Sequence, residues 1–323
     1  MMHALTSTRV KRRLSREEDG SQREWNSGHP KAHTSVLVEE VLSLLKPKKG
    51  EIVVDATAGQ GGHSEALLKA AHITLIALDA DLSAVKATSE RLKRFGSRAT
   101  VINANFADLD AVLAKVGVEQ ADAILFDLGW RSEQLASGKG FSFLQNEPLD
   151  MSYGERPRSG FTASEILNTW DEKVIADVLF GYGEERYARR IAKAVVERRK
   201  TAPIETTIEL VEIVRDAVPP GYRHGKIHPA TKTFQALRIA VNDELRSLEE
   251  GLKAAWKRLA EGGRVAVISF HSLEDRVVKR FFADLAKKKK AELLTKKPIS
   301  ATRSEVITNP SARSAKLRGI KKI

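Results

Sequence analysis

The chain has 323 residues, of which 42% are hydrophobic and 30% are charged, proportions typical of a globular protein in water. No segment approaches the roughly 20 consecutive apolar residues that a bilayer-spanning helix needs, so we exclude a membrane protein and expect no membrane partner. The chain has no cysteine, which excludes disulfides and thiolate metal sites, and we expect no bound metal and a cytoplasmic location.

Positive charge is concentrated near the end of the sequence. The formal net charge is +12, and most of this excess lies in residues 287–323, which include the run from Lys287 to Lys290. Such a cluster can neutralise phosphates and release counterions, which favours a nucleic-acid partner. A solvated basic tail is the alternative.

The first part of the chain predicts a flexible tail followed by a parallel sheet. Residues 1–32 are polar and lack the apolar core of a secretory signal, so we predict a tail there. Short apolar runs then read as strands at residues 51–55, 73–79, 99–102 and 121–127. Helical patterns lie between the first three of them, at residues 64–71 and 82–94. Strands that alternate with helices predict right-handed crossovers and a parallel sheet.

The alternation stops after the fourth strand and resumes with a strand at residues 264–270. The segment between them begins with a stretch rich in Gly, Ser and Pro and continues with helical patterns. We therefore predict a helical insertion at residues 136–224. The sheet domain is then discontinuous and consists of residues 33–135 and 225–323.

The last third of the chain predicts one long helix and two final strands. Apolar residues from Phe234 to Leu248 recur at helical spacing and predict a single amphipathic helix before a turn at Gly262-Gly263. Residues 304–308 and 313–319 are separated by Asn309-Pro310-Ser311 and predict a terminal pair of antiparallel strands.

A glycine-rich loop follows the first predicted strand. It reads Gly59-Gln-Gly61-Gly62-His63-Ser64 and lies at the crossover where doubly wound sheets bind nucleotides. A nicotinamide-dinucleotide fingerprint needs glycine at the sixth position, which is Ser64 here, so the loop favours a ligand without a pyrophosphate. S-adenosylmethionine is the commonest such ligand on this architecture. As alternatives, each glycine could serve a tight turn and His63 could only start the helix.

Three side chains at predicted strand ends are candidates for binding or chemistry. Asp79 ends the second strand, where a carboxylate can accept both ribose hydroxyl protons, although a solvated strand end is the alternative. Asp127 ends the fourth strand, from which methyltransferases of this architecture address the methyl group and its acceptor. His271 follows the strand at 264–270, and Ser272 and Asp275 after it are spaced as a capping box.

Four aromatic residues follow the fourth strand: Trp130, Phe141, Phe143 and Tyr153. We expect one of them to stack on an unpaired base, and packing in a core of the insertion is the alternative. The Asn- or Asp-Pro-Pro-aromatic tetrapeptide of DNA amino-methyltransferases is absent from the sequence.

Seven motifs along the chain are distinctive. They are Gly59-Gln-Gly-Gly-His-Ser64, Gly140-Phe-Ser-Phe143, Pro148-Leu-Asp-Met151, Tyr182-Gly-Glu-Glu-Arg186, His228-Pro-Ala-Thr-Lys-Thr-Phe-Gln-Ala-Leu-Arg238, Ser269-Phe-His-Ser-Leu-Glu-Asp-Arg276 and Asn309-Pro-Ser-Ala-Arg313. In this order they resemble the RsmH (MraW) family of ribosomal RNA cytidine N4-methyltransferases. The resemblance runs from about His33 to Arg318.

The resemblance implies an α/β class I S-adenosylmethionine-dependent methyltransferase fold, which is Rossmann-like with a mostly parallel sheet, antiparallel C-terminal strands and an inserted helical substrate-recognition domain. It implies S-adenosylmethionine as cofactor and 16S ribosomal RNA, within the small ribosomal subunit, as partner. The acceptor is N4 of a cytidine in the decoding region. Implied cofactor contacts are Gly61, Gly62, His63, Asp79, Phe106, Asp127 and Gln134. Asp127 and His271 are our candidate catalytic residues, because either could accept a proton from the amine.

The chain departs from the family pattern at two places. Trp130-Arg131-Ser132 stands where the family usually has Val-Ser-Ser, and Ser152-Tyr153 stands where it usually has Arg-Met. Both departures are expected on the substrate side of the site. Three other functions stay open: a nicotinamide-dependent oxidoreductase, a non-catalytic RNA-binding or ribosome-assembly protein, and a methyltransferase for another nucleic-acid cytosine.

Overall fold

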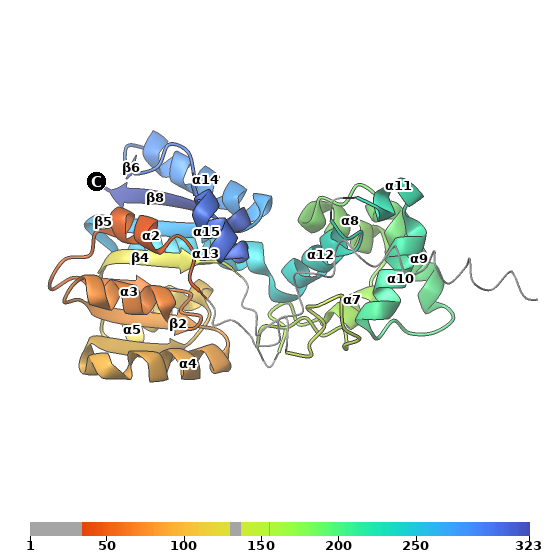
Figure 1. Ribbon diagram of the computed structural model, residues 1–323, viewed down its shortest axis with the longest axis horizontal. Helices are drawn as coiled ribbons and strands as arrows, with labels where there is room; N and C mark the ends of the chain where they lie inside the picture. The colour runs from red at the N-terminus through yellow and green to blue at the C-terminus, as the bar shows by residue number, and fades with distance from the viewer. Residues whose placement is uncertain (1–33, 130–136, 155, 226) are drawn as a thin grey trace, which may run out of the picture. The chain divides into compact units, whose positions relative to one another are not determined.

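The computed structural model of the protein describes residues 34–129, 137–154, 156–225 and 227–323. Eight strands in this part form one sheet, in the order β3-β2-β1-β4-β5-β8-β6 with β7 beside β8 (Figure 1). Their bounds are β1 (Ile52–Asp55), β2 (Thr74–Asp79), β3 (Ala99–Asn103), β4 (Ala121–Asp127), β5 (Leu259–Ser269), β6 (Ala291–Leu293), β7 (Ile299–Ser300) and β8 (Lys316–Lys322). The first five run parallel, and β8 is antiparallel to its neighbours. This is the sheet of a class I methyltransferase, so the predicted fold class is confirmed.

Successive residues of a strand point to opposite faces of the sheet, and helices cover both faces, so both faces are buried. The helices and turns packed on it are α2 (Val38–Leu45), α3 (Gly62–Ala70), α4 (Leu82–Leu92), η1 (Lys93–Arg98), η2 (Phe106–Asp108), α5 (Leu109–Lys115), α13 (Glu244–Arg258), α14 (Ser272–Lys287), α15 (Arg303–Thr308) and η3 (Pro310–Ser314). On β1, Val54 belongs to one buried cluster together with α5, α13 and α14. Val53 belongs to the other, together with α2, α3 and the end of α4. These near-continuous apolar runs are why the parallel strands are readable from the sequence.

Of the predicted pair of final strands, the first is wrong and the second is confirmed from Lys316 onward. Residues 304–308 lie in α15, whose N-terminus is capped by the Thr302 hydroxyl, which accepts a hydrogen bond from Glu305 N at 3.2 Å. Residues 313–319 begin in η3 and only then enter β8. β8 inserts between β5 and β6, so the basic C-terminal stretch is a folded part of the sheet and not a tail.

The remaining described helices surround a buried cluster of their own. They are α7 (Ala163–Thr169), α8 (Glu172–Gly183), α9 (Ala188–Arg199), α10 (Thr207–Ala217), α11 (Pro220–Arg223) and α12 (Thr231–Asn242), drawn in green to cyan in Figure 1. Leu179, Ile191, Leu210 and Leu237 are fully buried members of this cluster. It shares no residue with the two clusters of the sheet.

The predicted long helix is two helices. Asp243 lies between α12 and α13 with φ of 48°, in the left-handed region that ends a helix. The single-helix prediction is therefore wrong, because helical spacing of apolar residues does not reveal one reversed backbone angle. The predicted Gly262-Gly263 turn is an irregularity inside β5, where Gly262 has φ of 73°.

Contacts along the chain separate residues 1–33 from residues 34–323. The predicted tail at 1–32 lies outside the described residues. The division into a discontinuous sheet domain and an insertion at 136–224 stays a prediction. Within the part that the structure describes, no helix combines the length and the apolar character needed to cross a membrane.

Candidate functional site

The carboxyl ends of β1, β2 and β4 bring three acidic residues to one edge of the sheet. Asp55, Asp79 and Asp127 are the last residues of these strands. β1 lies between β2 and β4, and Asp55 is in register with Ala77 and Leu125. Open parallel sheets bind their ligands at this edge. The fold therefore gathers Asp79 and Asp127 as the sequence predicts.

The glycine loop between β1 and α3 has a backbone that side chains would obstruct. Gly59 and Gly61 have φ of 55° and 77°, in the left-handed region that glycine adopts without steric cost. A Cβ atom on Gly62 would lie 2.1 Å from the Ser35 hydroxyl oxygen. The Thr88 hydroxyl donates a hydrogen bond to the Gly59 carbonyl at 2.8 Å. These contacts hold the loop in place, and glycine at positions 61 and 62 allows it to pack closely on Thr88 and Ser35.

Asp79 joins this loop to the start of α4. Its Oδ2 accepts a hydrogen bond from Gly59 N at 2.8 Å, and its Oδ1 accepts one from Asp81 N at 2.9 Å. A carboxylate offers about four acceptor positions, so both bonds are compatible with a ribose diol at the same group. The geometry fits the predicted ribose contact and adds a structural role for Asp79 that the sequence does not reveal.

His63 and Asp127 face each other at the same edge. His63 Nε2 and Asp127 Oδ2 are 3.4 Å apart, and the two side chains are 5% and 14% exposed. Burial lowers the pKa of His63, but the Asp127 carboxylate, with help from Asp55, outweighs burial and raises that pKa above its ordinary value. The Asp127 backbone N–H donates to the Thr57 hydroxyl oxygen, which fixes the end of β4.

This pair contains buried polar atoms without hydrogen-bond partners among the described residues. They are His63 Nδ1 and Asp127 Oδ1, while His63 Nε2 has only its ionic contact of 3.4 Å with Asp127 Oδ2. Nearly all buried polar atoms in folded proteins are bonded, so unpartnered ones indicate room for a polar ligand or water. The amino, carboxylate and hydroxyl groups of S-adenosylmethionine are suitable partners, and the glycine loop runs directly into α3, which carries His63. The residues present therefore fit this cofactor.

Ser64, which interrupts the dinucleotide fingerprint, is bonded to Asp55. Its hydroxyl donates to Asp55 Oδ2 at 2.7 Å, and both residues are 0% exposed. Burial raises the pKa of Asp55, and the Ser64 bond opposes that shift. A glycine at position 64 would remove this donor from a buried carboxyl group. The buried Asp55 therefore needs serine at position 64, whereas a dinucleotide fingerprint would require glycine there.

Phe106 and Gln134 are the remaining predicted cofactor contacts. Phe106 lies in η2 after β3, with its ring edge-on to Phe126 and the two centroids 5.7 Å apart. β3 ends beside β2, where Asn103 is in register with Asp79. This location suits a ring beside a bound nucleoside. Gln134 lies outside the described residues, and its role stays a prediction.

His271 follows β5, the strand next to β4, and caps α14. Its Nδ1 accepts a hydrogen bond from Glu274 N at 3.4 Å, while Glu274 Oε2 accepts one from His271 N at 3.2 Å. The predicted capping box of Ser272 and Asp275 is therefore wrong by one residue. Asp275 instead accepts a hydrogen bond from Arg318 at 2.7 Å. The structure gives His271 a structural task, and its catalytic role stays untested.

A buried polar network, missed by the sequence analysis, lies close to His271. Arg238 donates to both oxygens of Glu244 at 2.7 and 2.8 Å, and the Tyr153 hydroxyl donates to Glu244 Oε1 at 2.8 Å. The Arg238 side chain is 3% exposed, so its charge requires this partner. Burial raises the pKa of Tyr153 well above its ordinary value, so Tyr153 acts as a neutral donor.

Ligand atoms of Glu244, His271 and Glu274 lie within 4.8 Å of one another, which makes them a candidate metal cluster of the described chain. However, both oxygens of Glu244 bind Arg238, and Glu274 Oε2 accepts hydrogen bonds from Phe270 N and His271 N. A cation would have to compete with a guanidinium group that is already in place. We therefore interpret the cluster as an ion-pair network.

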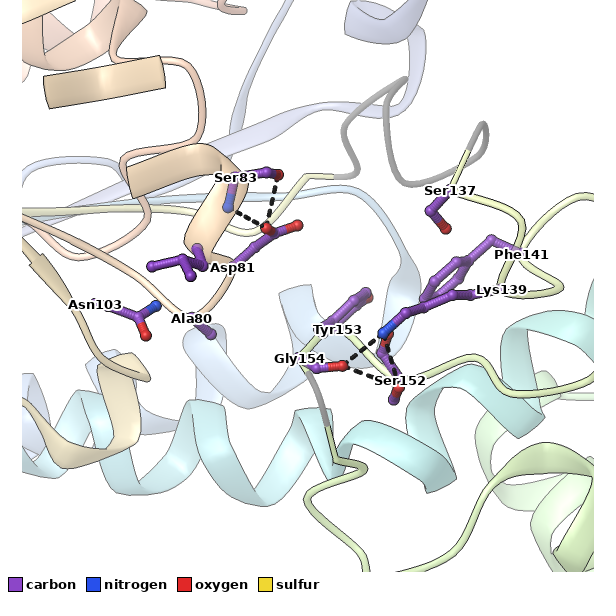
Figure 2. Close-up of a pocket in the computed structure, with 11 residues that line it drawn as sticks. Ala80, Asp81, Ser83, Asn103, Ser137, Lys139, Phe141, Ser152, Tyr153 and Gly154 are labelled. Carbon is purple, nitrogen blue, oxygen red and sulfur yellow. Dashed lines mark hydrogen bonds between the residues drawn. The ribbon is translucent and has the colours of Figure 1, made fainter. Parts of the chain in front are cut away.

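A pocket of about 530 Å³ opens at Ala80, the residue that follows Asp79 in the chain (Figure 2). Asp81, Ser83 and Asn103 line one side, and Lys139 and Tyr153 line the other. The Lys139 ammonium group donates to the Gly154 carbonyl at 2.6 Å, which holds this wall together. Small-molecule sites commonly have about 300–1,000 Å³. The departure from the family pattern at Ser152-Tyr153 is therefore part of a pocket wall.

The described aromatic residues after β4 pack within the protein. Phe141 stacks on Tyr153 with centroids 5.6 Å apart, and Phe143 stacks on His228 with centroids 4.5 Å apart. Phe141 is 4% exposed, which matches the packing alternative. Trp130 lies outside the described residues, so contact of one aromatic ring with a base stays a prediction.

Comparisons with known proteins give a family match over almost the whole chain. A model of the MraW methylase family matches residues 30–323. The ribosomal RNA small subunit methyltransferase H of Sulfurihydrogenibium sp. (strain YO3AOP1) is 48% identical over 287 residues, which is 88% of this chain and 97% of that protein. The protein of the same name from Heliobacterium modesticaldum is 46% identical over 310 residues, with coverage of 90% and 98%. A crystal structure of an rRNA methylase from Streptococcus thermophilus has a TM-score of 0.42 and 13% identity, with coverage of 88% and 93%.

Proposed function

The chain belongs to the MraW methylase family, and from this premise we propose that it transfers a methyl group from S-adenosylmethionine to N4 of a cytidine in 16S ribosomal RNA. The observation that carries the proposal is the buried pair of His63 and Asp127, in which His63 Nδ1 and Asp127 Oδ1 have no hydrogen-bond partner among the described residues. It occurs in a chain that is 44–48% identical to proteins named for small-subunit ribosomal RNA methylation.

The cofactor is proposed to lie across the ends of β1, β2 and β4. Gly61 and Gly62 offer backbone close to its amino-acid end, Asp79 accepts from its ribose, and Phe106 flanks its adenine. Gln134 is proposed to complete this set. When bound, S-adenosylmethionine supplies an electrophilic methyl group on a sulfonium.

The chemistry asks the protein mainly for orientation. In an in-line displacement the N4–C bond forms while the S–C bond breaks, and N4 then releases one proton. Asp127 Oδ1 has no hydrogen-bond partner in the described chain, so we assign this carboxylate to hold the amine and accept the proton. His63 Nε2 lies 3.4 Å from Asp127 Oδ2 and holds this carboxylate in place, which makes His63 a positioning residue. His271 stays a second candidate for the proton acceptor because it follows the neighbouring strand.

The acceptor cytidine is proposed to be unpaired or flipped outward, because a stacked base hides its exocyclic amine from a buried site. The helical region at 136–224 would bind the RNA on either side of the target cytidine. An assembled small ribosomal subunit as substrate, and therefore a cytoplasmic location, belong to the same proposal.

The comparisons do not favour the non-catalytic RNA-binding protein that the sequence left open, which predicts RNA affinity without turnover. Purified protein and labelled S-adenosylmethionine would be incubated with unmodified 16S ribosomal RNA and with assembled small subunits, followed by nucleoside mass spectrometry. We expect N4-methylcytidine in at least one sample, and a large loss of product with Asp127→Ala. RNA binding by the wild-type protein with no methylated nucleoside in either sample would refute the proposal.

A further inference from the structure

The basic residues at the two ends of helix α9 have different surroundings: those near its C-terminus have hydrogen-bonding partners, and those near its N-terminus are exposed. Near its C-terminus, Arg198 pairs with Glu209 at 3.4 Å, and Arg199 donates to the Trp170 carbonyl at 2.7 Å. Four basic side chains at and just before the N-terminus are exposed: Arg186, Arg189, Arg190 and Lys193. In the described part of the chain, none of these four forms an ion pair. We call them the α9 basic surface.

Helix stability does not explain this placement. Positive charge at a helix N-terminus opposes the helix dipole, and the first turn of α9 has no acidic residue, although the buried Glu185 just before the helix accepts a hydrogen bond from Tyr187 N at 2.8 Å. Arg189 and Lys193 are four residues apart, a spacing at which like charges repel on a helix. One buried carboxylate does not balance four exposed basic side chains, so this excess of positive charge points to a function. The helix end and the side chains together attract anions.

Two tyrosine rings hold Arg186 in a defined orientation. The guanidinium carbon lies 4.9 Å from the centroid of Tyr187 and 4.8 Å from that of Tyr222. The Tyr222 hydroxyl donates to Glu185 Oε2 at 2.6 Å, and Glu185 is 0% exposed. Stacking fixes the plane of a guanidinium group and leaves its N–H edge for phosphate oxygens. Less side-chain entropy is then lost on binding.

The α9 basic surface adjoins the edge of the sheet that carries the candidate site. Glu184, two residues before Arg186, accepts hydrogen bonds from the Ser272 hydroxyl at 2.9 Å and from Arg276 at 2.8 Å. Ser272 opens α14 directly after β5, and the end of β5 is paired with the end of β4. The other basic cluster, Lys287 to Lys290, begins at the far end of this helix, about 24 Å from its start at 1.5 Å per residue.

We propose that the α9 basic surface binds the phosphodiester backbone of the RNA strand that flanks the target nucleotide. This inference rests on the proposed function, because it takes RNA as the substrate. Phosphate contacts position a strand without reading its sequence. The α9 basic surface therefore contributes affinity for the RNA and positions the strand, while residues around the pocket select the base.

The test compares Arg186→Gln/Arg190→Gln with wild type, with Lys287→Gln/Lys290→Gln as a charge-matched control at the C-terminal end of α14 and the turn after it. Affinity for a short single-stranded RNA is measured by fluorescence anisotropy over a series of salt concentrations, beside kcat and KM for methylation. We expect the slope of log K against log salt to become shallower by about 1.4 in the α9 variant, about 0.7 for each lost phosphate contact. KM rises with the loss of affinity, while kcat and cofactor affinity stay at wild-type values.

The outcomes separate this inference from the proposed function. A wild-type slope in the α9 variant, or a larger change in the α14 control, would overturn the α9 basic surface while wild-type methylation still stands. No methylation by the wild-type protein would overturn the proposed function itself. Arg186→Lys/Arg190→Lys restores the charge, so we expect it to recover the wild-type slope, and failure to recover it would also overturn the assignment.

Discussion

His63 is a buried imidazole whose protonation depends mainly on one neighbour. Burial lowers its pKa, and the Asp127 carboxylate at 3.4 Å raises it by more. We predict that Asp127→Asn brings the pKa of His63 below its ordinary value of 6.5, because burial then acts against the weaker attraction of Asp55 and Glu305. An NMR titration of the imidazole Cε1–H signal in wild type and variant measures this shift.

The same pair links stability to pH. Because the folded-state pKa of His63 is raised, its contribution to the free energy of unfolding is fully present below the unfolded value of about 6.5 and is lost as pH rises through the folded value. The stability difference between wild type and His63→Gln therefore shrinks above that pH. His72→Gln, at an exposed histidine, is the matched control. An unchanged His63 pKa in Asp127→Asn would remove this account of the pair.

The site residues that the sequence identifies correctly as strand ends share a simple physical basis. Parallel strands end at one edge, so Asp79 and Asp127 are brought together by topology alone. Arg238 and Glu244 are different, because a separation of six residues does not place two side chains on one helical face. The left-handed Asp243 between them creates the contact, and no periodic pattern reports that angle.

The positions of Gly183 and Glu184 at the C-terminus of α8 are determined by packing against α12 and not by the usual preference for glycine after a helix. Glycine usually takes the left-handed position after a helix, yet Gly183 is the last helical residue and Glu184 has φ of 49°. A Cβ atom on Gly183 would lie 2.4 Å from the Lys232 carbonyl oxygen in α12. Glycine is therefore needed for the close approach of α8 and α12, and Glu184 takes the left-handed position while it binds Ser272 and Arg276.

This arrangement predicts opposite behaviour for two adjacent substitutions. Gly183→Ala lowers the free energy of unfolding by about 1–3 kcal/mol, because the new methyl group meets backbone that must move. Glu184→Gly changes it by less than about 1 kcal/mol, since relief of left-handed strain of about 1 kcal/mol offsets an exposed ion pair worth up to about 1 kcal/mol. Guanidinium denaturation of both variants measures the difference. A larger loss for Glu184→Gly than for Gly183→Ala would contradict this interpretation.

At the scale of the whole molecule, local sequence patterns predict the parallel strands of the sheet but do not predict how the antiparallel strands are arranged. β1, β2 and β4 are read correctly because each is an apolar run whose central residues are buried. β3 is also read correctly although none of its residues is fully buried, whereas β5 is predicted only from residue 264 and begins at Leu259. β6, β7 and the place of β8 depend on pairing between segments that carry weak local signals, such as the three residues of β6. The sequence therefore predicts the carboxyl ends of the parallel strands, where the candidate site lies, better than it predicts the antiparallel strands on the far side of the sheet.

A ligand that binds only the folded chain stabilises the entire molecule by mass action. At a concentration of S-adenosylmethionine about 100 times its Kd, the free energy of unfolding rises by about 2.7 kcal/mol. For a large domain this raises Tm by about 5–10 °C, at about 2–4 °C for each kcal/mol. We predict this shift for wild type in differential scanning fluorimetry and a smaller one for Asp79→Asn. NADH at the same concentration leaves Tm unchanged, because Ser64 and its bond to Asp55 occupy the position where the dinucleotide fingerprint has glycine. A shift with NADH and none with S-adenosylmethionine would restore the oxidoreductase alternative.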